Sequence, residues 1–176
     1  MTHSPLREKI RSVPDFPKKG IVFRDITTLL KDRTGFAEVA DTLYEQYRDA
    51  RIDKVVGIES RGFIFGAVLA YRLGAGFVLV RKPGKLPAAK TRQEYALEYG
   101  TDAIEIHDDA IARGERILVH DDLLATGGTV EASCRLVERL GGKIVGLSFL
   151  IELAFLGGRK RLQGYDIFSL VRYETE

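Results

Sequence analysis

The chain has 176 residues, of which 45% are hydrophobic and 30% are charged, and its formal net charge is +2. This length suits one compact domain and is short for two, so we expect a single domain over residues 1–176. A nearly balanced charge argues against a nucleic-acid coat protein and against a polybasic membrane binder. We therefore expect neither nucleic acid nor a membrane as a partner.

The N-terminal sequence and the cysteine content predict a cytoplasmic protein. MTHSPLREKIRSV (1–13) lacks the apolar core of a signal peptide, and no apolar run approaches the roughly 18 residues of a spanning helix. Cys134 is the only cysteine, which excludes an internal disulfide.

Three elements are expected before residue 51. Residues 4–13 predict a short helix, because Ser4 suits an N-cap and Pro5 suits the first helical position. Residues 14–27, PDFPKKGIVFRDIT, are punctuated by prolines and a glycine and predict an ordered loop without regular structure. Residues 35–50 carry apolar side chains at helical spacing and predict an amphipathic helix.

The rest of the chain alternates between apolar strands and helices. We expect strands at 53–59, 76–82, 116–122, 143–152 and 165–171, and helices at 62–73 and 128–140. This order predicts an α/β fold, an open, mostly parallel, twisted sheet flanked by helices on both faces. Ligands of such a sheet bind at the carboxyl ends of its strands.

A polar insertion, residues 83–106, interrupts this alternation. Long insertions of this kind in compact domains are usually lids, binding loops or disordered segments. Alternating apolar side chains predict a small hairpin within it: Tyr95, Leu97, Tyr99, Ile104 and Ile106.

The stretch VHDDLLATGGTV (119–130) joins an expected strand to an expected helix. Small residues and hydroxyls fill the turn: Ala125, Thr126, Gly127, Gly128 and Thr129. Free N–H groups at such a turn bind anions, and a phosphate monoester is the natural guest. The turn is neither a Walker A motif nor a G-x-G-x-x-G fingerprint. A plain strand–helix turn is the alternative interpretation.

Asp121 and Asp122 favour a functional interpretation of this turn. We expect them to end the strand and to point to opposite faces of the sheet. Two adjacent carboxylates repel each other unless a cation or hydroxyl groups lie between them. Vicinal sugar hydroxyls with Mg²⁺ meet that need, so acids and turn together predict a ribose 5-phosphate site. A helix cap or a solvated strand end is the alternative for one Asp alone.

The stretch ILVHDDLLATGGT resembles the signature of the type I phosphoribosyltransferase family, and its LLATGGT part resembles the members that use adenine. Further segments resemble the same members, in the family's order and over nearly the whole chain: PDFPKKGIVFRDIT (14–27), ESRGFIFG (59–66), RKPGKLP (81–87) and YALEYG (95–100). The signature alone indicates only the superfamily, whereas the set is highly specific.

The resemblance implies a glycosyltransferase (pentosyltransferase) of purine salvage in the type I phosphoribosyltransferase fold. Such an enzyme transfers the phosphoribosyl group of 5-phosphoribosyl-1-pyrophosphate to adenine and gives AMP and pyrophosphate, with Mg²⁺ as cofactor. It further implies a homodimer, an N-terminal hood (1–34) that holds the base and a flexible lid (83–106).

The resemblance also assigns the donor site. The turn at 125–129 holds the 5-phosphate, and Asp121 and Asp122 hold the ribose hydroxyls directly or through Mg²⁺. Pyrophosphate is expected at Glu59, Ser60, Arg61, Arg81, Lys82 and Lys85. A non-proline cis peptide is expected at Glu59–Ser60. For each single lysine, a solvated surface position is the alternative.

The base is expected at Val22, Phe23 and Arg24, with the ring of Phe23 stacked on adenine and the backbone of Val22 bonded to it. Without the resemblance, Phe23 reads as a core residue and Arg24 as a partner of Asp25.

Glu98 is the residue that we assign to proton chemistry at N7 of the base, with Arg61 as the second catalytic residue. Tyr95 and Tyr99 are expected to close the lid and exclude water. A solvated lid residue is the alternative for Glu98. We expect His120 to be a hydrogen-bonded core residue and Cys134 to be an inert one.

Two rival functions remain. A related transferase acting on an oxopurine is the nearer one. The other is a non-catalytic regulator that senses the phosphoribosyl donor.

Overall fold

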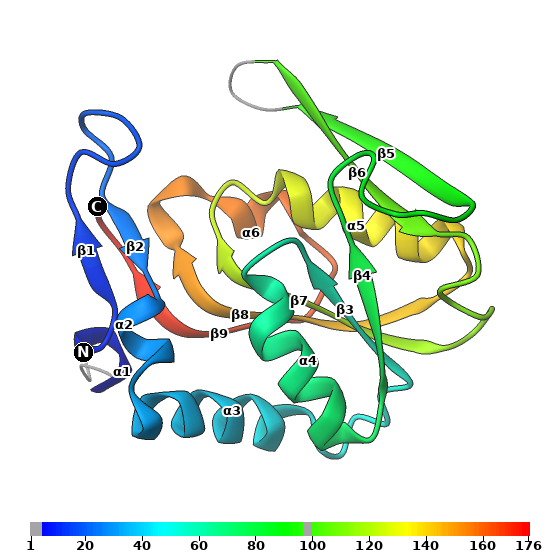
Figure 1. The fold of residues 1–176 in the computed structure, drawn as a ribbon, viewed down its shortest axis with the longest axis horizontal. Helices are drawn as coiled ribbons and strands as arrows, with labels where there is room; N and C mark the ends of the chain where they lie inside the picture. Colours follow the sequence, from blue (N-terminus) through cyan, green and yellow to red (C-terminus); the bar gives the residue numbers. More distant parts are fainter. Residues whose placement is uncertain (1–4, 97–99) are drawn as a thin grey trace.

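The computed structural model describes residues 5–96 and 100–176. Its centre is a sheet of five parallel strands in the order β4-β3-β7-β8-β9 (Figure 1). The strands are β3 (Lys54–Ile58), β4 (Gly76–Val80), β7 (Arg116–Leu124), β8 (Lys143–Leu153) and β9 (Ile167–Tyr173). The predicted open parallel sheet is confirmed.

Helices cover both faces of the sheet (Figure 1). α3 (Arg33–Tyr47) and α4 (Gly62–Leu73) pack on one face, whereas α5 (Gly128–Arg139) packs on the other. Each strand supplies side chains to both layers: Val55 belongs to the core beneath α3 and α4, and Val56 to the core beneath α5. The strands are therefore nearly continuous apolar runs, which is why the sequence predicts them well.

The N-terminal segment differs from the prediction. The expected helix at 4–13 is only α1 (Pro5–Glu8), and Ser4 lies outside the described residues. It is followed by β1 (Arg11–Val13), which pairs antiparallel with β2 (Phe23–Asp25) inside the segment expected to be a loop. α2 (Thr27–Leu30) then leads into α3. The β1–β2 pair stands at the β9 side of the sheet (Figure 1).

The predicted hairpin is confirmed. β5 (Lys90–Ala96) and β6 (Thr101–His107) pair antiparallel, with Gln93 opposite Ile104. β6 contributes Ile104 and Ile106 to the core beneath α5, so the hairpin is fastened to the domain at this end. Leu97 and Tyr99 lie outside the described residues.

Two further differences concern the strand ends. β7 continues to Leu124, two residues beyond the expected end at 122. After β8, a short 3₁₀ turn, η1 (Ala154–Leu156), leads into the one-turn helix α6 (Gly158–Arg161). Within the described part of the chain, we find no helix with the length and apolar character needed to cross a membrane.

The two residues expected to be core are core. His120 is fully buried, its Nδ1 lies 3.2 Å from Ser148 Oγ, and burial lowers its pKa to about 4. Its Nε2 has no hydrogen-bond partner among the described residues. Cys134 is buried in α5, and burial raises the pKa of its thiol to about 12. A neutral imidazole and an un-ionised thiol are what an inert interior position requires.

Candidate active site

The loop between β7 and α5 surrounds a small cavity. Residues 125–130 line about 80 Å³ of space together with Asp121 and Leu123. Gly127 has φ +82°, a left-handed conformation that other residues adopt at a cost. Among the described residues, we find no protein acceptor for the N–H groups of 126–129. A turn with free N–H groups at the start of a helix is suited to a phosphate.

Asp121 and Asp122 lie inside β7 and do not end it, because the strand continues through Leu123 and Leu124. They point to opposite faces, as neighbours on a strand must. Asp121 faces the loop cavity, whereas Asp122 is only 5% exposed and its Oδ2 lies 2.9 Å from Arg61 Nε. Burial and the negative charge of Asp122 raise the pKa of Asp121. Burial also raises the pKa of Asp122, against the influence of Arg61.

This acid pair is the feature of the site that fits a divalent cation. Within the described ranges, we find no group of three or more His, Cys, Asp or Glu side chains that could hold a metal ion. Asp122 Oδ2 is nevertheless a buried oxygen that accepts no hydrogen bond among the described residues. Its contact with Arg61 Nε is an ion pair without hydrogen-bond geometry. A hard cation such as Mg²⁺ fits here if a bound substrate supplies most of its oxygen ligands.

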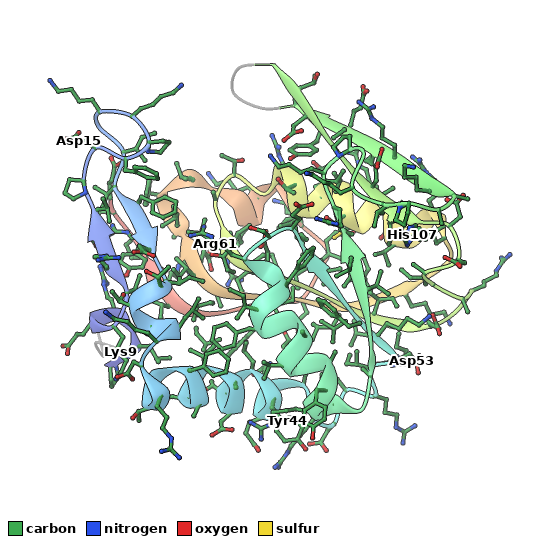
Figure 2. All side chains as sticks on the ribbon, in the orientation of Figure 1. Lys9, Asp15, Tyr44, Asp53, Arg61 and His107 are labelled. Atoms are coloured by element: carbon green, nitrogen blue, oxygen red, sulfur yellow. The ribbon has the colours of Figure 1, made fainter. Side chains whose placement is uncertain are left out.

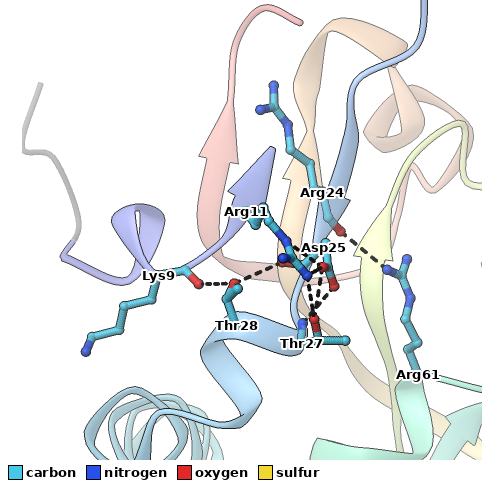
Figure 3. A network of polar contacts seen from close by, with 7 residues as sticks. All are labelled: Lys9, Arg11, Arg24, Asp25, Thr27, Thr28 and Arg61. Atoms are coloured by element: carbon cyan, nitrogen blue, oxygen red, sulfur yellow. Dashed lines mark hydrogen bonds and ion pairs between the residues drawn. The ribbon is translucent and has the colours of Figure 1, made fainter. Parts of the chain in front are cut away.

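The turn after β3 brings Arg61 to the same edge of the sheet. Its first peptide, Glu59–Ser60, is cis, as expected. The guanidinium of Arg61 (labelled in Figure 2) donates to the carbonyl O of Arg24 at 3.3 Å (Figure 3). It also contacts Asp122 and lies 4.9 Å from the ring centroid of Phe23. One side chain thus joins the β3 turn, β7 and the N-terminal segment.

Of the other expected pyrophosphate residues, Arg81 and Lys82 contact the carboxylate of Glu59, and Ser60 is exposed. Arg81 binds Glu59 through Nε at 3.1 Å and Nη2 at 3.3 Å, and Lys82 N donates to the same carboxylate at 3.0 Å. Glu59 N donates to the carbonyl O of Val80. The carboxylate and the N–H of Glu59 are therefore both bonded within the protein, and the carboxylate holds Arg81 and the backbone of Lys82. Lys85 is exposed.

The β2 segment presents Phe23 and buries Arg24. Phe23 is half-buried, with the ring of Phe16 edge-on at 5.2 Å. Arg24 is 7% exposed, its Nη1 donates to Ser12 Oγ at 2.5 Å, and its guanidinium lies 4.0 Å from the Tyr173 ring centroid. The alternative pairing of Arg24 with Asp25 is wrong, because Asp25 pairs with Arg11 (Figure 3). The Arg24 group that faces Arg61 is its carbonyl.

Val22 N donates to the Glu176 side chain at 3.1 Å. The C-terminal residue therefore reaches the segment where the base is expected, which sequence reasoning missed. Local patterns do not reveal such a contact, because the two residues lie at opposite ends of the chain.

The hairpin carries the remaining predicted residues. Tyr95 Oη donates to Asp102 Oδ2 at 3.1 Å, and Lys82 Nζ lies 3.5 Å from the same oxygen. Asp102 thus holds the hairpin to the loop after β4, a role that its place in a polar insertion does not indicate. Glu98 and Tyr99 lie outside the described residues, so their roles stay predictions.

Arg161 of α6 is a second residue beside the site that the sequence analysis does not name. Its Nη1 lies 2.9 Å from the position that a Cβ on Gly128 would take, and its Nε lies 3.9 Å from Glu131 Oε2. The basic run GRKR directly after the β8 turn was the available signal.

The fold and this edge of the sheet define a class of protein. A parallel sheet that places a carboxylate pair, a free-N–H turn and an arginine at neighbouring strand ends is built to bind a phosphorylated sugar. The family model described as phosphoribosyl transferase domain matches residues 25–171, and the chain belongs to this family.

Its relatives are more specific. The adenine phosphoribosyltransferase of Acidobacterium capsulatum is 61% identical over 176 residues, covering 98% of this chain and 97% of that one. The crystal structure of adenine phosphoribosyltransferase from Thermoanaerobacter pseudethanolicus matches with a TM-score of 0.93 at 55% identity, covering 96% and 98% of the two chains. The Saccharomyces cerevisiae enzyme, solved with adenine and an imino-altritol bisphosphate, matches with a TM-score of 0.87 at 39% identity, covering 93% and 95%.

Proposed function

We propose that this chain is an adenine phosphoribosyltransferase, which converts adenine and 5-phosphoribosyl-1-pyrophosphate into AMP and pyrophosphate. The observation that carries the proposal is the meeting of Asp121, Asp122 and Arg61 with the 125–129 loop at one sheet edge. The choice of adenine is supported by the relatives, whose names state that base and whose similarity extends over nearly the whole chain.

The proposed reaction breaks the bond between ribose C1 and the pyrophosphate oxygen and forms a bond from C1 to the base. The 125–129 loop holds the 5-phosphate, and Asp121 holds ribose hydroxyls beside it. Arg61 faces the departing pyrophosphate, with Lys82 and Lys85 adding positive charge. Most of the rate enhancement comes from positioning the reactants and from cations around the leaving group.

We place the base between the N-terminal segment and the sheet. Phe23 offers an aromatic face. The Val22 backbone is the proposed donor and acceptor, and its N–H, which donates to the Glu176 side chain in this structure, would exchange that partner for the base. Glu98 is proposed to accept or share the N7 proton as the bond to C1 forms. Tyr95, and with it Tyr99, is proposed to close the hairpin over the donor and exclude water.

Mg²⁺ is the proposed cofactor, with Asp121 and Asp122 as its protein ligands or as partners of the water molecules around it. Held there, Mg²⁺ would supply positive charge for the pyrophosphate group. Residues 125–129 and Arg61 orient 5-phosphoribosyl-1-pyrophosphate without needing the ion.

Direct product analysis tests the proposal. The full chain is incubated with adenine and 5-phosphoribosyl-1-pyrophosphate, with Mg²⁺ and with excess chelator, and AMP and pyrophosphate are quantified. We expect both products in equal amounts and only with Mg²⁺. The double variant Asp121→Asn/Asp122→Asn serves as the site control and should lose activity. Donor binding without any AMP in the wild type would instead support a non-catalytic sensor.

We also propose a homodimer in the cytoplasm. The dimer rests on the family resemblance, and the compartment rests on the absence of any cysteine other than the buried Cys134. Light scattering of the purified chain measures the mass directly: twice 19.6 kDa is expected, and a monomer over the working concentration range would contradict it.

A further inference from the structure

The one-turn helix α6 lies directly against the backbone of the 125–129 loop. A Cβ on Gly158 would lie 2.3 Å from the carbonyl O of Ala125, which no side chain tolerates without movement. From the loop side, a Cβ on Gly127 would lie 3.0 Å from the carbonyl O of Gly158 and 3.5 Å from Leu162 Cγ. Because backbone meets backbone here, a displacement of α6 displaces the loop.

An ion pair between a buried carboxylate and a half-buried arginine fixes α6 to the sheet. Glu152, near the end of β8, is 2% exposed and accepts from Arg159 of α6 through both carboxylate oxygens, at 2.7 and 2.8 Å. Ser169 of β9 donates to the same carboxylate at 2.6 Å, and Arg159 Nη1 donates to the carbonyl O of Ile167 at 3.2 Å. Burial alone would raise the pKa of Glu152, but bonds from Arg159 and Ser169 hold it below its ordinary value.

Among the described residues, α6 has one further ion pair, a longer one from Arg161 Nε to Glu131 Oε2 at 3.9 Å. α6 has the sequence GRKR, and Gly158 is its only buried residue. An isolated helical turn is unstable because ordering it fixes several dihedral angles for one hydrogen bond. A bidentate arginine–carboxylate pair is directional, so it sets orientation as well as distance. Leu162, buried next to α6, adds apolar contact without that directionality.

We propose that the Glu152–Arg159 ion pair positions the 125–129 loop for the 5-phosphate, acting through Gly158. The inference rests on the proposed function, because it takes that loop to be the phosphate site. Arg159 is thus a positioning residue: it contacts the support of the loop and not the ligand. The close approaches of α6 are to the β7 loop. Loss of the Glu152–Arg159 pair should therefore weaken 5-phosphate binding and spare pyrophosphate binding at the β3 turn.

Calorimetry with two probes, ribose 5-phosphate and pyrophosphate with Mg²⁺, tests this selectivity. In Arg159→Met we expect the Kd of ribose 5-phosphate to rise about tenfold or more, because the N–H groups of the 125–129 loop lose their alignment with the phosphate. The Kd of pyrophosphate should stay within about twofold. In steady state, KM for the phosphoribosyl donor should rise more than kcat falls. Arg159→Lys, which keeps the positive charge but cannot form the bidentate contact, should recover part of the affinity for ribose 5-phosphate.

Arg159→Met leaves the buried Glu152 carboxylate with Ser169 and with Arg172, whose Nε lies 4.0 Å from it, and the loss of the bidentate partner risks unfolding. The double variant Glu152→Gln/Arg159→Met removes that charge, and a cooperative thermal transition verifies its fold. Arg48→Met, an exposed arginine paired with Glu45 on α3, is the matched control and should leave both Kd values unchanged.

The outcomes separate the inference from the function on which it rests. Unchanged ribose 5-phosphate affinity in a folded Arg159 variant overturns the inference, and so does an equal loss of affinity for both probes. A wild-type chain that binds neither probe overturns the proposed function, and the inference with it.

Discussion

At the scale of single residues, Arg61 organises the site. It pairs with Asp122, holds the Arg24 carbonyl and lies over Phe23. The sequence indicates that Arg61 and the two acids lie at the same edge of the sheet, because each follows an apolar run expected to be a parallel strand. It does not indicate that Arg61 pairs with Asp122 and not Asp121, since this depends on which face of β7 each acid occupies.

Glu98 is the residue whose predicted role most needs a direct test. We expect Glu98→Ala to lower kcat by about 10²-fold or more, because acid–base assistance is lost, with KM for the donor changed little. Glu94→Ala, on the same hairpin and paired with exposed Arg92, is the control and should retain activity. Steady-state kinetics with both substrates varied measures kcat and KM separately. Unchanged turnover in Glu98→Ala would remove this residue from the mechanism.

His120 predicts a pH dependence of stability. Its folded pKa is about 4, below the ordinary value of 6.5, so between these values the unfolded chain binds more protons. The free energy of unfolding therefore falls as pH falls from about 6.5 toward 4, by roughly 3 kcal/mol at most.

Urea unfolding of the wild type and of His120→Asn between pH 7 and 4.5 measures this contribution. The variant should be less stable at pH 7 but should lose less stability on acidification. The raised pKa values of Asp121 and Asp122 act in the opposite direction in both proteins, so the difference between them isolates His120. Parallel pH curves would show that His120 is not held neutral.

At the scale of elements, apolar patterning predicts the sheet and the three long helices. It fails at β1 and β2, because each of these strands has only three residues, too few for an alternating pattern, and the two are joined by a proline-rich segment. It also ends β7 early, because Asp121 and Asp122 look like a solvated strand end. The structure extends the strand past them, since Asp122 is buried against Arg61.

The packing of α4 on β7 offers a test at this scale. A Cβ on Gly62 would lie 2.8 Å from Asp121 Oδ1 and 3.0 Å from the carbonyl O of His120. Gly62→Ala should therefore push α4 from β7, lower the free energy of unfolding by about 1–3 kcal/mol and raise KM for the donor.

Gly76→Ala is the matched control, because its Cβ would meet only the flexible side chain of Lys54, at 3.3 Å. Urea unfolding and donor kinetics of the two variants, measured side by side, make the comparison. If Gly62→Ala matches Gly76→Ala in both quantities, the close approach of α4 to Asp121 has no energetic consequence.

At the scale of the whole molecule, the parallel sheet brings together residues that are far apart in sequence. The β3 turn, the β7 loop and α6 meet at one edge because parallel strands end on the same side, and this much follows from the order of strands and helices. The contacts of Glu176 with Val22, Asp102 with Lys82 and Gly158 with Ala125 do not follow from it. They depend on side-chain directions and loop paths that only the folded chain fixes.

Purine competition distinguishes adenine from the oxopurines as the base that this chain uses. The wild-type chain is given Mg²⁺, a limiting amount of 5-phosphoribosyl-1-pyrophosphate and equal concentrations of adenine, hypoxanthine, guanine and xanthine, and the nucleotides formed are separated and quantified. An adenine phosphoribosyltransferase should yield AMP as the dominant product. A larger yield of any oxopurine nucleotide would contradict the account and identify the chain as a transferase for that base.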